Sequence, residues 1–274
     1  MFSFLYEVVL FIYLFLFCEL LSGLIFCLFC RILQHFNTNP NEYSVIFTSG
    51  ATQALKLVAE SFDWKNDRST EIHNQNGTEK HNSNGIQVGH GSQYTGSPGT
   101  FMYLQDNHTS VLGMRELAKS TSASVMTLPY EDAFKCFQDY NDEISTNKYD
   151  GNSLFVYPAQ SNFSGVKYPL SWVSKVQRGI LNKKLKNKKN SRWFCLLDAA
   201  SFLSTNPLDL SQVKPDFICL SFYKIFGYPT GLGALIVKND SAFVLKRTYF
   251  GGGTVLMCLS SECTQIRRPG LSER

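Results

Sequence analysis

Hydrophobic residues gather in seven short runs, separated by polar turns and by segments with helical spacing. The runs are four or five residues long, rich in aliphatic and aromatic side chains and bounded by turn formers, which is typical of buried strands. They lie at 43–47, 101–104, 124–128, 153–157, 193–197, 217–220 and 233–237. Apolar residues recur at helical spacing in 53–62, from Val111 onward and in 172–181. Continuous apolar strands that alternate with helices predict an α/β fold, with a mostly parallel sheet covered by helices on both faces.

The N-terminus differs from the rest of the chain, since its first 30 residues carry only two charges, Glu7 and Glu19. A helix over residues 8–30 would be about 34 Å long, which is enough to cross a bilayer. Arg31 follows this stretch and no basic residue precedes it, so the positive-inside rule places the body of the chain in the cytoplasm. A cleaved signal peptide is the alternative, but it needs a basic start and a small-residue cleavage site, and both are missing. Residues 1–34 are therefore expected to form an apolar helix capable of spanning a membrane.

Composition and charge exclude several function classes. A formal net charge of +4 over 274 residues is too small to indicate nucleic-acid binding. Of the eight cysteines, only Cys27 and Cys30 show a paired spacing, and they lie inside the apolar stretch. The cysteines thus predict neither a disulfide scaffold nor a metal site. Residues 65–100 are rich in Asn, Ser, Gly and Thr and almost free of aliphatic side chains, which predicts a disordered surface loop.

Candidate chemistry lies where the predicted strands end, at the edge where parallel sheets bind their ligands. Asp198 follows one strand, and Lys224 follows the next strand 26 residues later. Pyridoxal phosphate needs such a pair, because a lysine amine forms a Schiff base with its aldehyde and a carboxylate keeps its ring nitrogen protonated. Gly50-Ala51-Thr52, at a strand-to-helix turn, offers backbone N–H groups to a phosphate. A turn of this kind also occurs as a plain helix start.

Five segments, in the same order, resemble the molybdenum cofactor sulfurases, a family of the class-V aminotransferase superfamily with a cysteine-desulfurase-like N-terminal domain. The segments are residues 41–64, 104–116 (LQDNHTSVLGMRE), 154–170, 196–237 and 249–254. The string SFYKIFGYPTGLGALIV at 221–237 is specific, because desulfurases proper carry a His where this chain has Tyr223. The resemblance covers about residues 35–255, and it implies a pyridoxal-phosphate-dependent transferase of fold type I.

The resemblance also implies roles for individual residues. Lys224 would be the Schiff-base lysine, Asp198 the partner of the pyridine nitrogen, and His108 the histidine that stacks on the ring and takes part in proton transfer. Asn162 would lie near the phenolic oxygen of the cofactor, and Thr254 belongs to a turn that in dimeric relatives reaches the phosphate of the neighbouring subunit. The implied phosphate contacts are Ala51, Thr52, Ser221 and Tyr223.

The implied activity takes sulfur from L-cysteine, releases alanine and sulfurates the molybdenum cofactor of xanthine dehydrogenase and aldehyde oxidase in the cytoplasm. The resemblance leaves open whether the chain forms a homodimer. The chain departs from the family at Ser201, where desulfurases have a glutamine, and after Thr254, where the resemblance ends. The fold is thus expected to be incomplete, with residues 256–274 as a non-homologous tail. The alternatives are an inactive truncated isoform, a fragment that only binds pyridoxal phosphate, or another class-V enzyme (a cysteine desulfurase or a kynureninase), which Tyr223 disfavours.

Sulfur transfer needs a mobile thiolate near the substrate, and the cysteines of this chain are poorly placed to supply it. Cys195 and Cys219 lie in apolar strands, where burial is expected to raise the thiol pKa and to block access. Cys136 lies away from the polar strand ends, while Cys258 and Cys263 lie in the tail with no family motif around them. This chain alone is therefore expected not to transfer sulfur.

Overall fold

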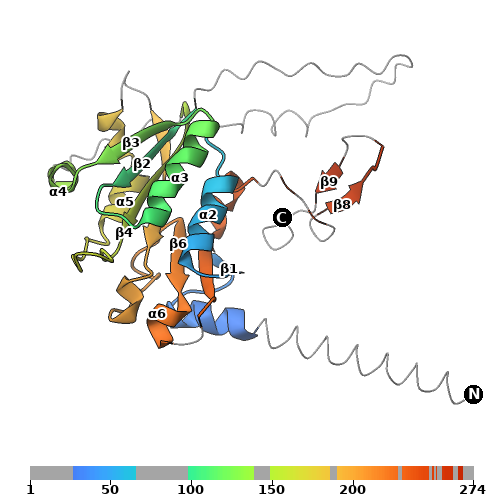
Figure 1. Ribbon diagram of the computed structural model, residues 1–274, viewed down its shortest axis with the longest axis horizontal. Helices are drawn as coiled ribbons and strands as arrows, with labels where there is room; N and C mark the ends of the chain where they lie inside the picture. The colour runs from blue at the N-terminus through green and yellow to red at the C-terminus, as the bar shows by residue number, and fades with distance from the viewer. Residues whose placement is uncertain are drawn as a thin grey trace, which may run out of the picture.

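The computed structural model describes residues 27–65, 98–138, 149–185, 190–227, 230–246, 249, 251, 255–261 and 265–267 (Figure 1). Most of the predicted apolar helix and most of the predicted polar loop at 65–100 lie outside these residues. Residues 27–35 are helical, and Ile32, Leu33 and Phe36 are buried in the core. None of the helices in the described part of the chain is both long and apolar enough to cross a membrane.

A seven-stranded sheet forms the centre of the molecule, in the order β1-β7-β6-β5-β4-β2-β3. Its strands are β1 (Tyr43–Thr48), β2 (Thr100–Leu104), β3 (Ser124–Leu128), β4 (Gly151–Pro158), β5 (Ser191–Asp198), β6 (Phe217–Ser221) and β7 (Gly233–Lys238). Only β7 runs against the others, since it pairs antiparallel with both β1 and β6, whereas the remaining pairs are parallel. The predicted mostly parallel sheet is confirmed, and each predicted strand is present.

The strands are apolar throughout because both faces of the sheet are covered. Along β5, Phe194 and Leu196 belong to one buried cluster, and Cys195 and Leu197 belong to the other. Figure 1 shows α2 (Ala51–Ser61) and α3 (Thr109–Ser120) side by side over one face. The opposite face carries α5 (Trp172–Gln177) and α4 (Tyr130–Gln138).

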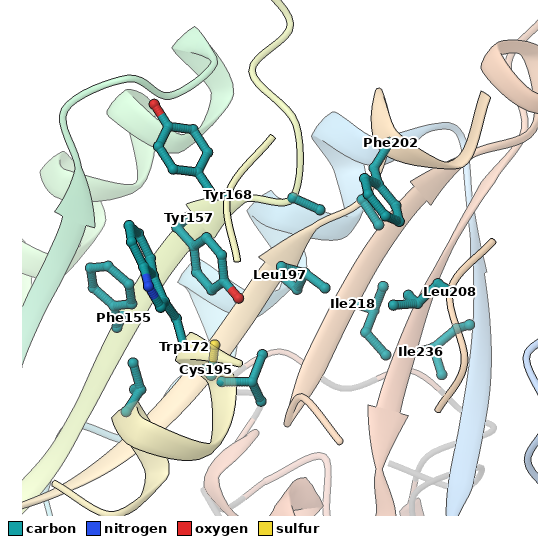
Figure 2. Close-up of a cluster of buried hydrophobic side chains, with 14 of the residues drawn as sticks. Phe155, Tyr157, Tyr168, Trp172, Cys195, Leu197, Phe202, Leu208, Ile218 and Ile236 are labelled. Carbon is teal, nitrogen blue, oxygen red and sulfur yellow. The ribbon is translucent and has the colours of Figure 1, made fainter. Parts of the chain in front are cut away.

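Aromatic side chains fill the layer between the sheet and α5. The Trp172 ring lies 4.5 Å from that of Phe137 and 5.6 Å from that of Tyr157, measured between ring centroids. Figure 2 shows Trp172 beside Phe155 and Tyr157, with Cys195 and Leu197 of β5 in the same layer. Burying one such aromatic side chain contributes roughly 2–3 kcal/mol to folding, so this layer anchors α5 on the sheet.

One carboxylate, that of Asp216, is buried just before β6. It accepts hydrogen bonds from the backbone N–H of Cys195 at 2.8 Å, from Gln177 Nε2 at 2.9 Å and from the Ser241 hydroxyl at 2.5 Å. Burial raises the pKa of the Asp216 carboxyl even though these donors lower it. Because the donors come from β5, α5 and the segment after β7, Asp216 ties three parts of the fold together.

The predicted helix boundaries need correction. The helix expected over 172–181 ends at Gln177, because Gly179 takes φ 85° and starts a separate 3-10 helix at Ile180–Lys184. The helix expected from Val111 begins at Thr109, since the His108 side chain caps it, and the helix expected over 53–62 begins at Ala51. Short elements absent from the prediction are α4 and the hairpin of β8 (Val255–Cys258) and β9 (Gln265–Arg267).

Candidate functional site

A cavity of about 290 Å³ opens where β4, β5 and β6 end and where α2 and α3 begin. The site residues predicted from the sequence line it, apart from Thr254, which lies outside the described residues. Its lining comprises Ser49, Gly50, Ala51, Thr52, Gln53, Leu55, His108, Ser110, Pro158, Gln160, Asn162, Asp198, Ala200, Ser201, Ser221, Tyr223 and Lys224. Residues from positions 49 to 224 thus converge because parallel strands bring their carboxyl ends to one edge.

The turn between β1 and α2 has the shape of an anion site. Gly50 stands before the helix with φ 151°, a conformation that favours glycine, and no side chain caps the first N–H groups of α2. Uncapped N–H groups and the helix dipole favour a negative charge at this end. Gly233 of β7 packs against the turn so closely that a Cβ atom there would lie 2.7 Å from Gly50 Cα. Two glycines therefore set the position of this turn.

His108 is held at the start of α3. Its Nδ1 lies 3.2 Å from the backbone nitrogen of Ser110, which donates to it, and 3.0 Å from Ser110 Oγ. A backbone N–H only donates, so Nδ1 carries a lone pair and the neutral ring bears its proton on Nε2. Ser110 Oγ also lies 2.8 Å from Thr52 Oγ1. Ser110, which the sequence analysis missed, thus connects the ring of His108 to the turn that begins α2.

Lys224 lies on α6 (Phe222–Phe226), a single helical turn that follows β6 directly and is capped by Gly227, which has φ 78°. Its Nζ donates to Asn162 Oδ1 at 2.7 Å. Lys224 is partly buried, whereas the neighbouring Tyr223 is exposed. The amine is therefore held by one amide oxygen and remains accessible from the cavity.

Asp198 ends β5 and is only 7% exposed. Its Oδ1 accepts a hydrogen bond from the backbone N–H of Ala200 at 3.0 Å. Cys219 lies directly beside Asp198 on β6. Burial raises the pKa of the Cys219 thiol, and the Asp198 carboxylate raises it further. Among the described residues, no lysine or arginine forms an ion pair with Asp198, so its carboxylate can serve a cationic group in the cavity.

These side chains fit pyridoxal phosphate. The Ser221 hydroxyl is buried, lines the cavity and has no hydrogen-bond partner among the described residues. Buried hydroxyl groups are normally paired, so this oxygen and the uncapped α2 turn are suited to a phosphate. The Lys224 amine and the Asp198 carboxylate are suited to an aldehyde and to a protonated ring nitrogen.

The cysteines of the described residues do not line this cavity. Cys195 and Cys219 are buried, and burial raises the pKa of both thiols well above its ordinary value, as predicted. Cys136 is buried in α4, and Cys258 is exposed on β8. Cys263 lies outside the described residues. A thiol that accepts sulfur would thus have to approach from elsewhere.

The chain is similar to one protein family and to several proteins of known name. The class-V aminotransferase model matches residues 67–271. Molybdenum cofactor sulfurase from Bombyx mori is 46% identical over 249 residues, covering 89% of this chain and 27% of the relative. The Homo sapiens molybdenum cofactor sulfurase is 44% identical over 244 residues, covering 89% of this chain and 24% of the relative. The chain thus spans about a quarter of the length of these relatives.

Solved structures share the fold at low sequence identity. The cystine C–S lyase C-DES, in complex with its reaction product cysteine persulfide, matches with a TM-score of 0.56 and 17% identity, over 92% of this chain and 56% of that protein. Cysteine desulfurase CsdA from Escherichia coli matches with a TM-score of 0.53 and 17% identity, over 82% of this chain and 46% of that protein. These matches support the predicted fold type.

Proposed function

The chain belongs to the class-V aminotransferase family, and from this membership we propose that it binds pyridoxal phosphate and draws sulfur from L-cysteine as a molybdenum cofactor sulfurase does. The observation that carries the proposal is the cavity itself, which joins the Lys224 amine, the Asp198 carboxylate and the uncapped turn before α2. The identity of 40–46% to molybdenum cofactor sulfurases supports the choice of activity within the family.

Each end of the cavity would hold a different part of the cofactor. Ala51, Thr52 and Ser221 would bind the phosphate, and Asp198 would keep a proton on the ring nitrogen. Lys224 would bind the aldehyde carbon through Nζ. Pyridoxal phosphate supplies an electron sink for the α-carbon of a bound amino acid.

Side chains of this chain would hold and move the protons of the reaction. The neutral His108 ring has its proton on Nε2, because Nδ1 accepts from Ser110. Nε2–H can therefore donate into the cavity, and His108 is proposed to stack over the ring there. The Lys224 amine would take the α-proton of the bound amino acid, and Asn162 Oδ1 would orient this amine.

The overall reaction balances without an oxidant. L-cysteine and a thiol RSH yield alanine and the persulfide RSSH: the Cβ–Sγ bond of cysteine breaks, a sulfur–sulfur bond forms, and the proton of the thiol ends on the methyl group of alanine. The described cysteines do not line the cavity, so RSH is proposed to come from another segment or from an added acceptor. The family resemblance supports the molybdenum cofactor of molybdenum hydroxylases as the final sulfur acceptor, and it supports a cytoplasmic location.

The experiment supplies the chain with pyridoxal phosphate and L-cysteine, with and without dithiothreitol as the thiol, and measures alanine. We expect alanine to appear when the thiol is present and to be absent with Lys224→Ala. Lys119→Ala, which changes an exposed lysine paired with Glu116 on α3, is the matched control and should behave as the parent. Equal alanine from Lys224→Ala and the parent would overturn the proposal.

A further inference from the structure

We propose that Asp106 is a positioning residue: it holds the loop 161–168 so that Asn162 Oδ1 keeps its hydrogen bond from the Lys224 amine. Asp106 lies in the turn between β2 and α3, two residues before His108, and does not line the cavity. The inference rests on the proposed function only for the role of Lys224. The contacts themselves can be tested without cofactor.

Three hydroxyl groups converge on the Asp106 carboxylate. Ser161 Oγ donates to Oδ1 at 2.9 Å, whereas Tyr168 Oη and Ser164 Oγ donate to Oδ2 at 2.7 and 3.2 Å. A carboxylate only accepts, so all three hydroxyl protons point to Asp106. Burial, followed by the Asp106 hydrogen bond, raises the pKa of Tyr168, which keeps the phenol protonated as a donor.

Ser161 transmits this anchor to the loop backbone. Because its proton goes to Asp106, its oxygen lone pairs are free to accept, and they take the backbone N–H groups of Phe163 at 3.3 Å and Ser164 at 3.1 Å. The Ser161 backbone adds two bonds, from its own N–H to the Val166 oxygen at 2.8 Å and from the Gly165 N–H to its oxygen at 3.0 Å. Asn162 therefore sits between Ser161, which carries this hydroxyl, and Phe163, whose backbone N–H donates to it.

Packing does not hold this part of the loop. Asn162 is exposed, and the Phe163 side chain is 98% exposed. Hydrogen bonds thus decide where the Asn162 amide lies, and the charged acceptor Asp106 makes the stronger ones, since bonds to an ionised group are worth about twice the neutral ones. Removing Asp106 should release Asn162 Oδ1 from Lys224 Nζ, although Asp106 touches neither atom.

The test measures how fast the Lys224 amine of the cofactor-free chain reacts with an acetylating reagent, by peptide mass spectrometry, with Lys214 as the internal reference. Lys214 lies near Glu42 on another part of the surface. We expect Asn162→Ala and Asp106→Ala each to speed acetylation of Lys224 by about three- to tenfold, the worth of one hydrogen bond. The double variant should react no faster than Asn162→Ala alone, because Asp106 acts through Asn162.

Milder variants keep the test decisive if Asp106→Ala fails to fold. Asp106→Asn keeps an acceptor oxygen and should give a smaller increase, while Ser161→Ala cuts the link to the loop and should match Asn162→Ala. Asp209→Ala is the matched control, because this exposed carboxylate also accepts from side chains, those of Ser211 and Asn37. It should leave the Lys224 rate unchanged.

Two results would overturn the inference: parent-like Lys224 rates in both Asp106→Asn and Ser161→Ala, or a double variant whose effect is the product of the two single effects. A failure of the proposed function would give a different experimental result from a failure of this inference. A chain that shows the expected acetylation pattern and does not take up pyridoxal phosphate would support the role of Asp106 and contradict only the cofactor assignment.

Discussion

Two buried carboxylates at different ends of neighbouring strands show how the framework and the site of this molecule differ. Asp216, at the amino end of β6, accepts from a backbone N–H, an amide and a hydroxyl. Asp198, at the carboxyl end of β5, accepts from the backbone N–H of Ala200 and faces a cavity. Both are less than a tenth exposed, so burial alone does not distinguish them.

The difference lies in what the surrounding chain leaves unsatisfied. Around Asp216 the fold supplies the donors that a buried carboxylate requires, and its role is structural. Around Asp198 the fold leaves acceptor capacity, and the nearby Ser221 hydroxyl has no partner among the described residues. Since polar groups are costly to bury unpaired, such groups together indicate where a ligand binds.

The largest effect on stability is expected from Asp216→Ala. Loss of the carboxylate leaves the buried Cys195 N–H and Ser241 hydroxyl without their acceptor, whereas Gln177 Nε2 keeps the Lys214 oxygen. The free energy of unfolding should therefore fall by about 3 kcal/mol. Urea denaturation followed by circular dichroism measures it. Asp150→Ala, which removes one exposed acceptor of the Asn190 backbone N–H, should cost less than about 1 kcal/mol. Equal losses from the two variants would show that Asp216 is not a structural tie.

Asp198→Ala should show the reverse pattern. Because the substitution leaves few hydrogen-bond donors without an acceptor, it should change the free energy of unfolding by less than about 1 kcal/mol. Its affinity for pyridoxal phosphate should drop about tenfold to a hundredfold, the worth of one hydrogen bond to a charged group. Equilibrium dialysis measures the affinity. Parent-like affinity in this variant would contradict the proposed role of Asp198.

Gly233→Ala tests whether the sheet residue that packs against the turn before α2 affects cofactor binding. A Cβ atom there would lie 2.5 Å from the Leu220 oxygen and 2.7 Å from Gly50 Cα, both backbone atoms, so the turn before α2 must shift. We expect a loss of about tenfold in pyridoxal phosphate affinity, since overpacking costs roughly 1–3 kcal/mol. Gly113→Ala, where a Cβ atom meets nothing within 4 Å, is the control. Parent-like affinity in Gly233→Ala would show that the turn position does not matter.

The smallest effect concerns pH. The pKa of Asp216 is raised in the folded state by burial, so the folded chain holds this proton more tightly than the unfolded chain does. The stabilisation that this bound proton gives to the folded chain is complete below the ordinary aspartate pKa of about 3.9. It is lost as pH rises through the pKa of Asp216 in the folded state.

The parent should therefore lose stability relative to Asp216→Asn over this rise in pH, because its folded state must give up a proton that it holds more tightly than the unfolded chain does. Urea unfolding of both proteins at a series of pH values provides the difference. A difference that is constant with pH would contradict the raised pKa.

The strands could be predicted from the sequence because the signal is local. β4 and β5 are continuous apolar runs whose successive residues serve opposite faces, and each prediction falls within two residues of the observed bounds. The amphipathic helix α4, absent from the prediction, has a local signal as well, since Ala133, Cys136 and Phe137 are buried at helical spacing.

The site could be predicted only in part. Asp198 and Lys224 were found because each follows a strand and the two suit one cofactor. Ser110 and Asp106 were missed because Thr52, the distant partner of Ser110, and the partners of Asp106 lie 55 to 62 residues away in the sequence, where no local pattern reports a contact. The roles of the individual site residues stay predictions, and that of Thr254 falls outside the described residues.

Borohydride reduction tests most directly whether this cavity holds pyridoxal phosphate on Lys224. The chain is incubated with pyridoxal phosphate, reduced, digested and mapped by mass spectrometry, with Lys224→Ala as the control. We expect the added cofactor mass on the peptide that contains Lys224 and no labelled peptide from the control. Label on other lysines with none on Lys224 would contradict the role proposed for Lys224.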